Sequence, residues 1–170
     1  QPAWAADGEE ESHPIVINTL PYSINQKFYQ VDTGRTEDVV VKDENGNDVV
    51  QTVPVYNTHF DYYYKHTATR AGRLTVQLKA TGVYCSASIA VNGVSSANIY
   101  TDGTKSAYVD LREGDVVTIH LSVTEDTNVN MNLSIADYPK GSKYDPYKTS
   151  LDELGSGIPV KLEKDDSVYY

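Results

Sequence analysis

Residues 107–121 read Ala107-Tyr108-Val109-Asp110-Leu111-Arg112-Glu113-Gly114-Asp115-Val116-Val117-Thr118-Ile119-His120-Leu121, and this stretch decides the fold class. In its second half Val117, Ile119 and Leu121 take every second position, which is the period of a β-strand with one buried face. Glu113-Gly114 provides turn residues between this strand and the apolar run before it. The stretch therefore predicts two β-strands with a turn between them.

The same pattern of alternating strands and turns extends over residues 15–138, where helix signals are nearly absent. Apolar residues alternate with polar ones at 74–78 and 131–135. Asn45-Gly46 lies between two valine runs, which is a strong type I′ hairpin signal, and two further turn dipeptides are Asn92-Gly93 and Asp102-Gly103. Short strands at regular spacing with glycine turns indicate an all-β sandwich or barrel. We expect an antiparallel β-sandwich with about eight strands in two sheets.

The two ends of the chain differ from this region. Ala3-Trp4-Ala5 has the small-x-small pattern of a signal-peptidase site and precedes an acidic run, although a cloning remnant would look the same. We therefore interpret residues 1–13 as a signal-peptide remnant and acidic tail outside the fold, and residues 14–139 as the β-sandwich module. Residues 140–157 are polar and interrupted by glycine and proline, which is typical of a linker.

Residues 158–170 repeat the pattern of residues 20–29. Both segments read as an apolar residue and proline, an alternating strand, a polar stretch and an aromatic pair. This repeat predicts either the first strand of a following similar module, as in tandem modules of a longer protein, or a strand that returns to the first sandwich.

Charge and composition limit the classes of partner that this chain can bind. The net charge is −10, so nucleic acid and anionic membrane surfaces, which require clustered Lys and Arg, are poor partners. No apolar run approaches the ~18 residues of a membrane helix, so we expect no membrane insertion. A neutral ligand such as a sugar, or a divalent cation, is compatible with this charge.

Catalytic and metal signals are weak. Cys85 is the single cysteine, so it forms no intrachain disulfide, and its small-residue surroundings predict a buried thiol. The oxygen-rich run 43–48 lacks the EF-hand positions for glycine and glutamate, so we interpret it as a hairpin turn and expect no cofactor, with a structural calcium ion left open.

His120 is expected to face outward between Ile119 and Leu121. No nucleophile-elbow, metalloprotease, P-loop or Rossmann motif occurs, and we expect no enzyme, although a pair among the 24 acidic residues could serve a hydrolase.

Three stretches resemble the bacterial pre-peptidase C-terminal type of β-sandwich. Residues 60–78 look like its aromatic strand, glycine turn and alternating strand, residues 109–119 like its glycine-aspartate segment, and residues 131–135 like its closing strand. The resemblance implies a jelly-roll-like, secreted accessory module. Several related sandwiches act as carbohydrate-binding modules, and tandem modules of this look are similar to those of cell-surface starch-binding proteins of Gram-positive gut bacteria. Fold by itself does not give function.

The aromatic composition indicates binding. Fourteen tyrosines stand beside two phenylalanines and one tryptophan, and a buried tyrosine hydroxyl needs a partner, so part of these rings should face water. Sugars stack their C–H faces on such rings and need polar partners at the rim. In a strand through 61–66, Tyr62 and Tyr64 share one face with His66. The resemblance implies that Tyr64 and His66 face inward, which leaves Tyr63 as the exposed ring and Tyr62 at the strand edge. We expect the ligand-binding residues to be Tyr62, Tyr63, Tyr100, Tyr84, Asn98 and Lys65.

These observations favour a secreted or cell-surface, non-catalytic module that binds a neutral polysaccharide. Starch or malto-oligosaccharide is the favoured partner, together with neighbouring domains of a longer chain. The alternatives are a protein-interaction or structural module, whose tyrosines form a protein interface, and an ancillary domain of a secreted peptidase.

Overall fold

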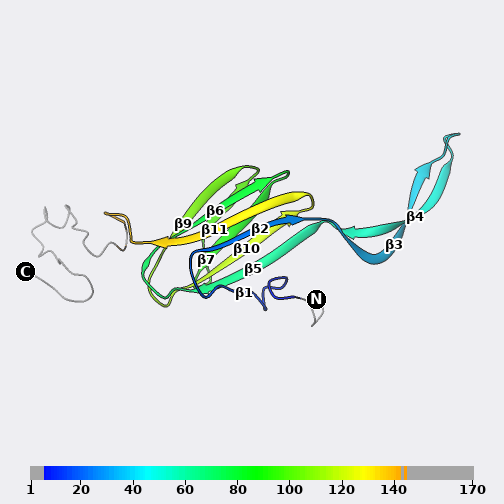
Figure 1. Ribbon diagram of the computed structural model, residues 1–170. Coiled ribbons are helices and arrows are strands. Elements are labelled where there is room, and N and C mark those ends of the chain that lie inside the picture. The colour runs from blue at the N-terminus through cyan, green and yellow to red at the C-terminus, as the bar shows by residue number, and fades with distance from the viewer. Residues whose placement is uncertain (1–5, 143, 145–170) are drawn as a thin grey trace, which may run out of the picture.

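The computed structural model describes residues 6–142 and residue 144. These residues form a β-sandwich without helices, from which one long hairpin projects (Figure 1). One sheet has the strand order β1-β5-β10-β7-β8 and the other β2-β11-β6-β9, while the hairpin consists of β3 and β4. The first sheet contains β1 (Ile15–Val16), β5 (His59–Thr67), β10 (Val116–Thr124), β7 (Cys85–Val91) and β8 (Val94–Thr101). The second contains β2 (Tyr22–Phe28), β11 (Thr127–Ala136), β6 (Gly72–Thr81) and β9 (Thr104–Leu111).

The predicted all-β sandwich is confirmed, with two differences in detail. The two packed sheets hold nine strands within the described residues, where about eight were expected. One pair is parallel, because β1 runs alongside β5 in the same direction. None of the described residues forms a helix long and apolar enough to cross a membrane.

The core lies between the two sheets and follows the period-2 pattern of the strands. In β10 the inward side chains Val117, Ile119 and Leu121 are at most 2% exposed. Strand β6 of the other sheet contributes Leu74, Val76 and Leu78, which are fully buried. Alternation therefore fixes which face of each strand is inside, and by exclusion which side chains face outward.

Strand β5 divides the tyrosine run between the two faces. Tyr64 and His66 are buried, as predicted, and the His66 Nδ1–H donates to the carbonyl of Ile17 at 2.7 Å. Burial raises the pKa of the Tyr64 hydroxyl. Tyr63 and Lys65 occupy the alternate, outward positions.

The hairpin of β3 (Val31–Lys42) and β4 (Asp48–Asn57) extends away from the sandwich (Figure 1). Its predicted turn is confirmed, but the loop spans residues 43–47 instead of two residues, because Lys42 pairs with Asp48. The Asp43 carboxylate accepts the backbone N–H groups of Asn45 and Asn47, each at 2.9 Å. This oxygen-rich run therefore works as a turn, with the Asp43 carboxylate committed to the backbone.

The acidic segment before β1 packs on the sandwich. The backbone N–H of Tyr63 donates to the carbonyl of Gly8 at 2.7 Å, and Gly8 N–H donates to the carbonyl of His13. A Cβ at Gly8 would lie 2.5 Å from Ile15 Cδ1, so the segment passes close to the sheet. Residues 6–13 thus belong to the folded domain, where the sequence predicted a tail.

The C-terminal part of the expected organisation falls mostly outside the described residues. This concerns the predicted linker at 140–157, of which only 140–142 and 144 are described, and the strand predicted within 158–170. The tandem-module prediction therefore stays a prediction.

Candidate functional site: the outer face of the five-stranded sheet

The outward side chains of β5, β10, β7 and β8 form rows across the sheet. Strand pairing places Tyr63 beside His120, His120 beside Ser88, and Ser88 beside Asn98. The next row along the strands contains Asp61, Ser122, Ser86 and Tyr100. We call these eight residues the outer face. Its middle is lined by serines, and its aromatic rings stand toward the two sides.

One side of the outer face carries a stacked pair of tyrosines. The rings of Tyr84, which precedes β7, and Tyr100 of β8 lie parallel, with centroids 4.8 Å apart and 7° between their planes. Tyr100 is 63% exposed and Tyr84 47% exposed, so each ring covers one face of its neighbour and keeps surface for a ligand. The negative charge of Asp102 raises the pKa of the Tyr84 hydroxyl, and its hydrogen bond adds to the effect. The pair is thus held in place before any ligand arrives.

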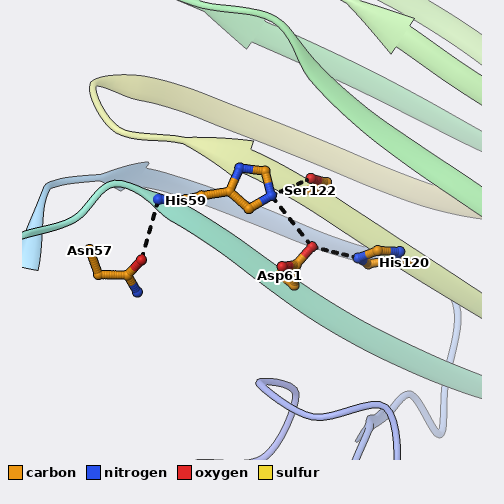
Figure 2. Close-up of polar contacts among 5 residues, drawn as sticks. All are labelled: Asn57, His59, Asp61, His120 and Ser122. Atoms are coloured by element: carbon orange, nitrogen blue, oxygen red, sulfur yellow. Dashed lines mark hydrogen bonds and ion pairs between the residues drawn. The ribbon is translucent and has the colours of Figure 1, made fainter.

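The other side carries a second stack, in which Tyr63 lies against the imidazole of His120. Their centroids are 4.4 Å apart and their planes differ by 10°. The His120 Nε2–H donates to Asp61 Oδ1 at 2.7 Å, which fixes the plane of the imidazole (Figure 2). Burial, and then the negative charges of Asp61 and Glu11, raise the pKa of the Tyr63 hydroxyl.

The group around Asp61 contains the residue types of a catalytic triad but not its geometry. Figure 2 shows that Asp61 and Ser122 both approach the same nitrogen of His59, at 3.7 Å and 3.0 Å from Nε2. A serine–histidine–aspartate triad needs the carboxylate on one ring nitrogen and the serine on the other. No His, Cys, Asp and Glu side chains among the described residues are grouped to hold a metal ion. The network instead orients polar groups at the edge of the outer face.

The sheet is hollowed beside the outer face, with Tyr63, Ser88 and His120 shared between the two. A cavity of about 620 Å³ lies there, and the segment before β1 contributes to its wall through Glu11, Ser12 and Pro14. Its volume is within the range of small-molecule sites. A second, more acidic hollow of about 600 Å³ adjoins it at Tyr63, with Asp61 and residues 9–12. The cavity of about 620 Å³ is lined by aromatic, hydroxyl and cationic groups, among them Tyr63, Lys65, Ser88, Thr118 and His120.

The structure brings five of the six expected binding residues to this side of the sheet. Tyr63, Asn98 and Tyr100 lie on the outer face, Lys65 lines the cavity and Tyr84 stacks on Tyr100. The Ser88 hydroxyl donates to Asn98 Oδ1 at 2.8 Å, which leaves the Asn98 amide nitrogen for a ligand.

Tyr62 does not join them, which corrects its assignment as a binding residue. Its ring packs on Phe28 with centroids 5.5 Å apart, on the inner side of β5 beside the core. The reason is the period of the strand: Tyr62 shares a face with Tyr64, and burial raises the pKa of its hydroxyl.

Several outer-face residues were not singled out from the sequence as binding residues. They are Asp61, Ser86, Ser88, His120 and Ser122. Alternation marks each as outward, and His120 was expected to face outward. Which strands are neighbours, however, is set by tertiary pairing, and β10 inserts between β5 and β7 although it follows them in the chain. Only that order brings the serines between the aromatic stacks.

Comparison with known proteins gives only distant likenesses. No protein-family model and no curated protein matches the chain, so the resemblance to pre-peptidase C-terminal sandwiches stays a prediction. Similar folds include the CBM6-3 module of Clostridium stercorarium in complex with cellobiose, at a TM-score of 0.29 and 11% identity over 65% of this chain and 94% of that one.

A family 35 carbohydrate-binding module of Clostridium thermocellum has a TM-score of 0.31 and 14% identity, over 65% of this chain and 84% of that one. The tryptic core of a Bacillus thuringiensis Cry1Da variant, a protein of another kind, has a TM-score of 0.35 and 9% identity, over 75% of this chain and 25% of that one. Similarity at this level does not transfer a function to the present chain.

Proposed function

We propose that this chain is a non-catalytic carbohydrate-binding module that recognises a neutral polysaccharide on the outer face. The observation that carries the proposal is the combination of two pre-stacked aromatic pairs with a line of serine hydroxyls on one side of the sheet. The Tyr84–Tyr100 pair is exposed and the Tyr63–His120 pair is half-buried. The rings offer apolar surface to the C–H faces of sugars, and Ser88, Asn98 and Lys65 offer donors and acceptors to the hydroxyls. Rigid platforms lose little side-chain entropy on binding.

The charge of the site supports a neutral ligand. Glu9, Glu10, Glu11 and Asp61 line the hollow beside Tyr63, and Asp102 lies beside Tyr84. These carboxylates would repel uronate-rich or sulfated glycans.

Starch or a related α-glucan is the glycan that we favour. The preference comes from the resemblance of the sequence to starch-binding modules, and the same resemblance favours a location outside the cell. Weak binding at each module would suit a polymer that offers many equivalent sites to neighbouring modules.

Native affinity electrophoresis in gels that contain starch, xylan or mucin tests this function. We expect starch to retard the wild-type chain, and Tyr100→Ala to restore most of its mobility. Loss of a stacking contact worth about 1 kcal/mol corresponds to roughly fivefold weaker binding. Tyr108→Ala is the matched control, because Tyr108 is also exposed (55%) but lies on β9 of the other sheet.

A protein-interaction function is the second candidate, and the projecting hairpin favours it. Val40 and Val50 pair across β3 and β4 and are 65% and 66% exposed. Two-stranded hairpins are marginal by themselves, and open strand edges invite pairing with another chain. Hydrogen exchange tests this: hairpin amides that are protected in proportion to protein concentration would indicate association, whereas fast exchange at every concentration would argue against self-association.

A further inference from the structure

We propose that a bound glycan crosses the strands and contacts both aromatic stacks, so that recognition needs about three linked sugar rings. This inference rests on the proposed function and adds the size and path of the ligand. The first stack is Tyr63 on His120 and the second is Tyr84 on Tyr100.

The path follows from the register of the strands. His120 lies on β10 and Tyr100 on β8, with β7 between them, and Tyr100 stands one outward position further along. Strand spacing and rise therefore place these residues about 12 Å apart, a distance that about three linked pyranose rings cover. A single sugar contacts one stack only.

The surface between the stacks is low enough for a sugar chain to lie on it. Ser86 and Ser88 of β7 and Ser122 of β10 are the outward residues there. Their side chains are short compared with the aromatic rings, so we expect a shallow trough between the two stacks. The hydroxyls along its floor offer hydrogen-bond partners to the sugar that sits between the rings.

Both stacks are preorganised in the free protein, which makes a two-point contact favourable. Tyr63 is held against an imidazole that Asp61 fixes at 2.7 Å, and Tyr100 is held against Tyr84. When one stack has bound the first sugar, the next rings reach the second stack without further loss of translational freedom. Affinity should thus increase with the number of sugars until both stacks are contacted.

Isothermal titration calorimetry with glucose, maltose, maltotriose and longer malto-oligosaccharides tests this path, with the xylose and cellulose series in parallel. We expect the wild-type Kd to fall by about fivefold or more when the chain reaches about three units, and to change little beyond about four. Tyr63→Ala and Tyr100→Ala should each remove that step, so that long oligosaccharides bind like short ones. Tyr63→Phe, which keeps the ring, should restore the step, and Tyr108→Ala should leave it intact.

The outcomes separate the two proposals. A Kd that is independent of chain length, or a step that Tyr63→Ala leaves unchanged, would show that one stack binds alone, and the two-stack path would be wrong while carbohydrate binding stands. Absence of binding to every glycan series would overturn both. Circular dichroism and urea unfolding of each variant show whether a lost step reflects a lost contact or a damaged fold.

Discussion

At the scale of single residues, the face of the strand on which an aromatic or thiol side chain lies decides whether it is buried or exposed. Tyr64 is buried and packs edge-on against Tyr22, with centroids 6.2 Å apart, whereas its neighbour Tyr63 faces outward and stacks on His120. The same alternation buries Cys85 to 2% exposure next to the exposed Tyr84. Outward-facing and core-packing residues are therefore adjacent in the sequence and lie on opposite faces of the sheet.

The Cys85 thiol provides a residue-scale prediction. Burial raises its pKa to about 11, so only about one molecule in a thousand carries the thiolate at pH 8. We expect iodoacetamide to label the native protein at pH 8 very slowly, and the urea-unfolded protein readily. Mass spectrometry follows the labelling over time. Rapid labelling of the native protein would contradict the buried position of Cys85.

At the scale of elements, two connections hold the strands in register by specific contacts. Asp115 joins the β9–β10 connection to the β7–β8 turn: its carboxylate accepts the backbone N–H of Arg112 at 2.8 Å and the Asn92 side-chain amide at 3.0 Å. Asn92 in turn accepts the backbone N–H of Val116 at 2.9 Å. The β6 strand begins at Gly72, which lies close to the end of β11.

Asp115→Asn tests the first connection. The backbone hydrogen bond from Arg112, and then the Asn92 amide, hold the pKa of Asp115 below its usual value. A lowered pKa in the folded state contributes stability above the unfolded pKa, and this contribution is lost as the pH falls through the folded pKa. Because Asp115 is only partly buried, we expect the variant to lose only about 1 kcal/mol at pH 7.

Urea unfolding of wild type and Asp115→Asn at a series of pH values provides the measurement. The difference in the free energy of unfolding between the two proteins should narrow as the pH falls below the ordinary pKa range of aspartate. A gap that stays constant down to pH 2 would show that the charge of Asp115 does not contribute.

Gly72→Ala tests the second connection. A Cβ at this position would lie 2.4 Å from the backbone carbonyl oxygen of Ala136 and 3.1 Å from Ile135 Cγ1, so the end of β11 would have to move. We expect a loss of several kcal/mol, because backbone cannot yield as a flexible side chain does.

Gly93→Ala is the comparison for Gly72→Ala, because its φ of 80° strains an alanine although nothing lies within 4 Å of the added Cβ. That strain is about 1–2 kcal/mol. Thermal unfolding that ranks Gly72→Ala as no more harmful than Gly93→Ala would contradict the close approach of β6 and β11.

At the scale of the whole molecule, the sandwich and the hairpin are separate structural units. The core cluster consists of residues from the two packed sheets and their connections. Among the described residues, β3 and β4 pair only with each other (Figure 1). The hairpin therefore adds little to the stability of the sandwich, and the outer face does not depend on it.

Shortening the hairpin tests this independence. Asp32 pairs with Tyr56 near its base, so residues 33–55 can be replaced by Asn-Gly, which forms a two-residue hairpin turn. We expect the melting temperature to change by only a few degrees and glycan retardation to be unchanged. Loss of cooperative unfolding would show instead that the hairpin is required for the fold.

The sequence predicts the class of fold and the direction of most side chains because both depend on local periodicity. Val117, Ile119 and Leu121 define the buried face of β10 without any knowledge of its partners. The sequence does not predict that β10 lies between β5 and β7, because that order arises from long-range pairing. For this reason Tyr100 was expected among the binding residues while His120 and the serines were not. Tyr62 was expected at the strand edge, whereas its ring packs on Phe28 beside the core.

Affinity electrophoresis of the wild type beside Tyr100→Ala in starch gels tests the central claim most directly. Carbohydrate binding on the outer face predicts that starch retards the wild type and the Tyr108→Ala control alike, and that Tyr100→Ala migrates nearly as in a gel without glycan. Equal migration of all three proteins in starch, xylan and mucin gels would contradict it.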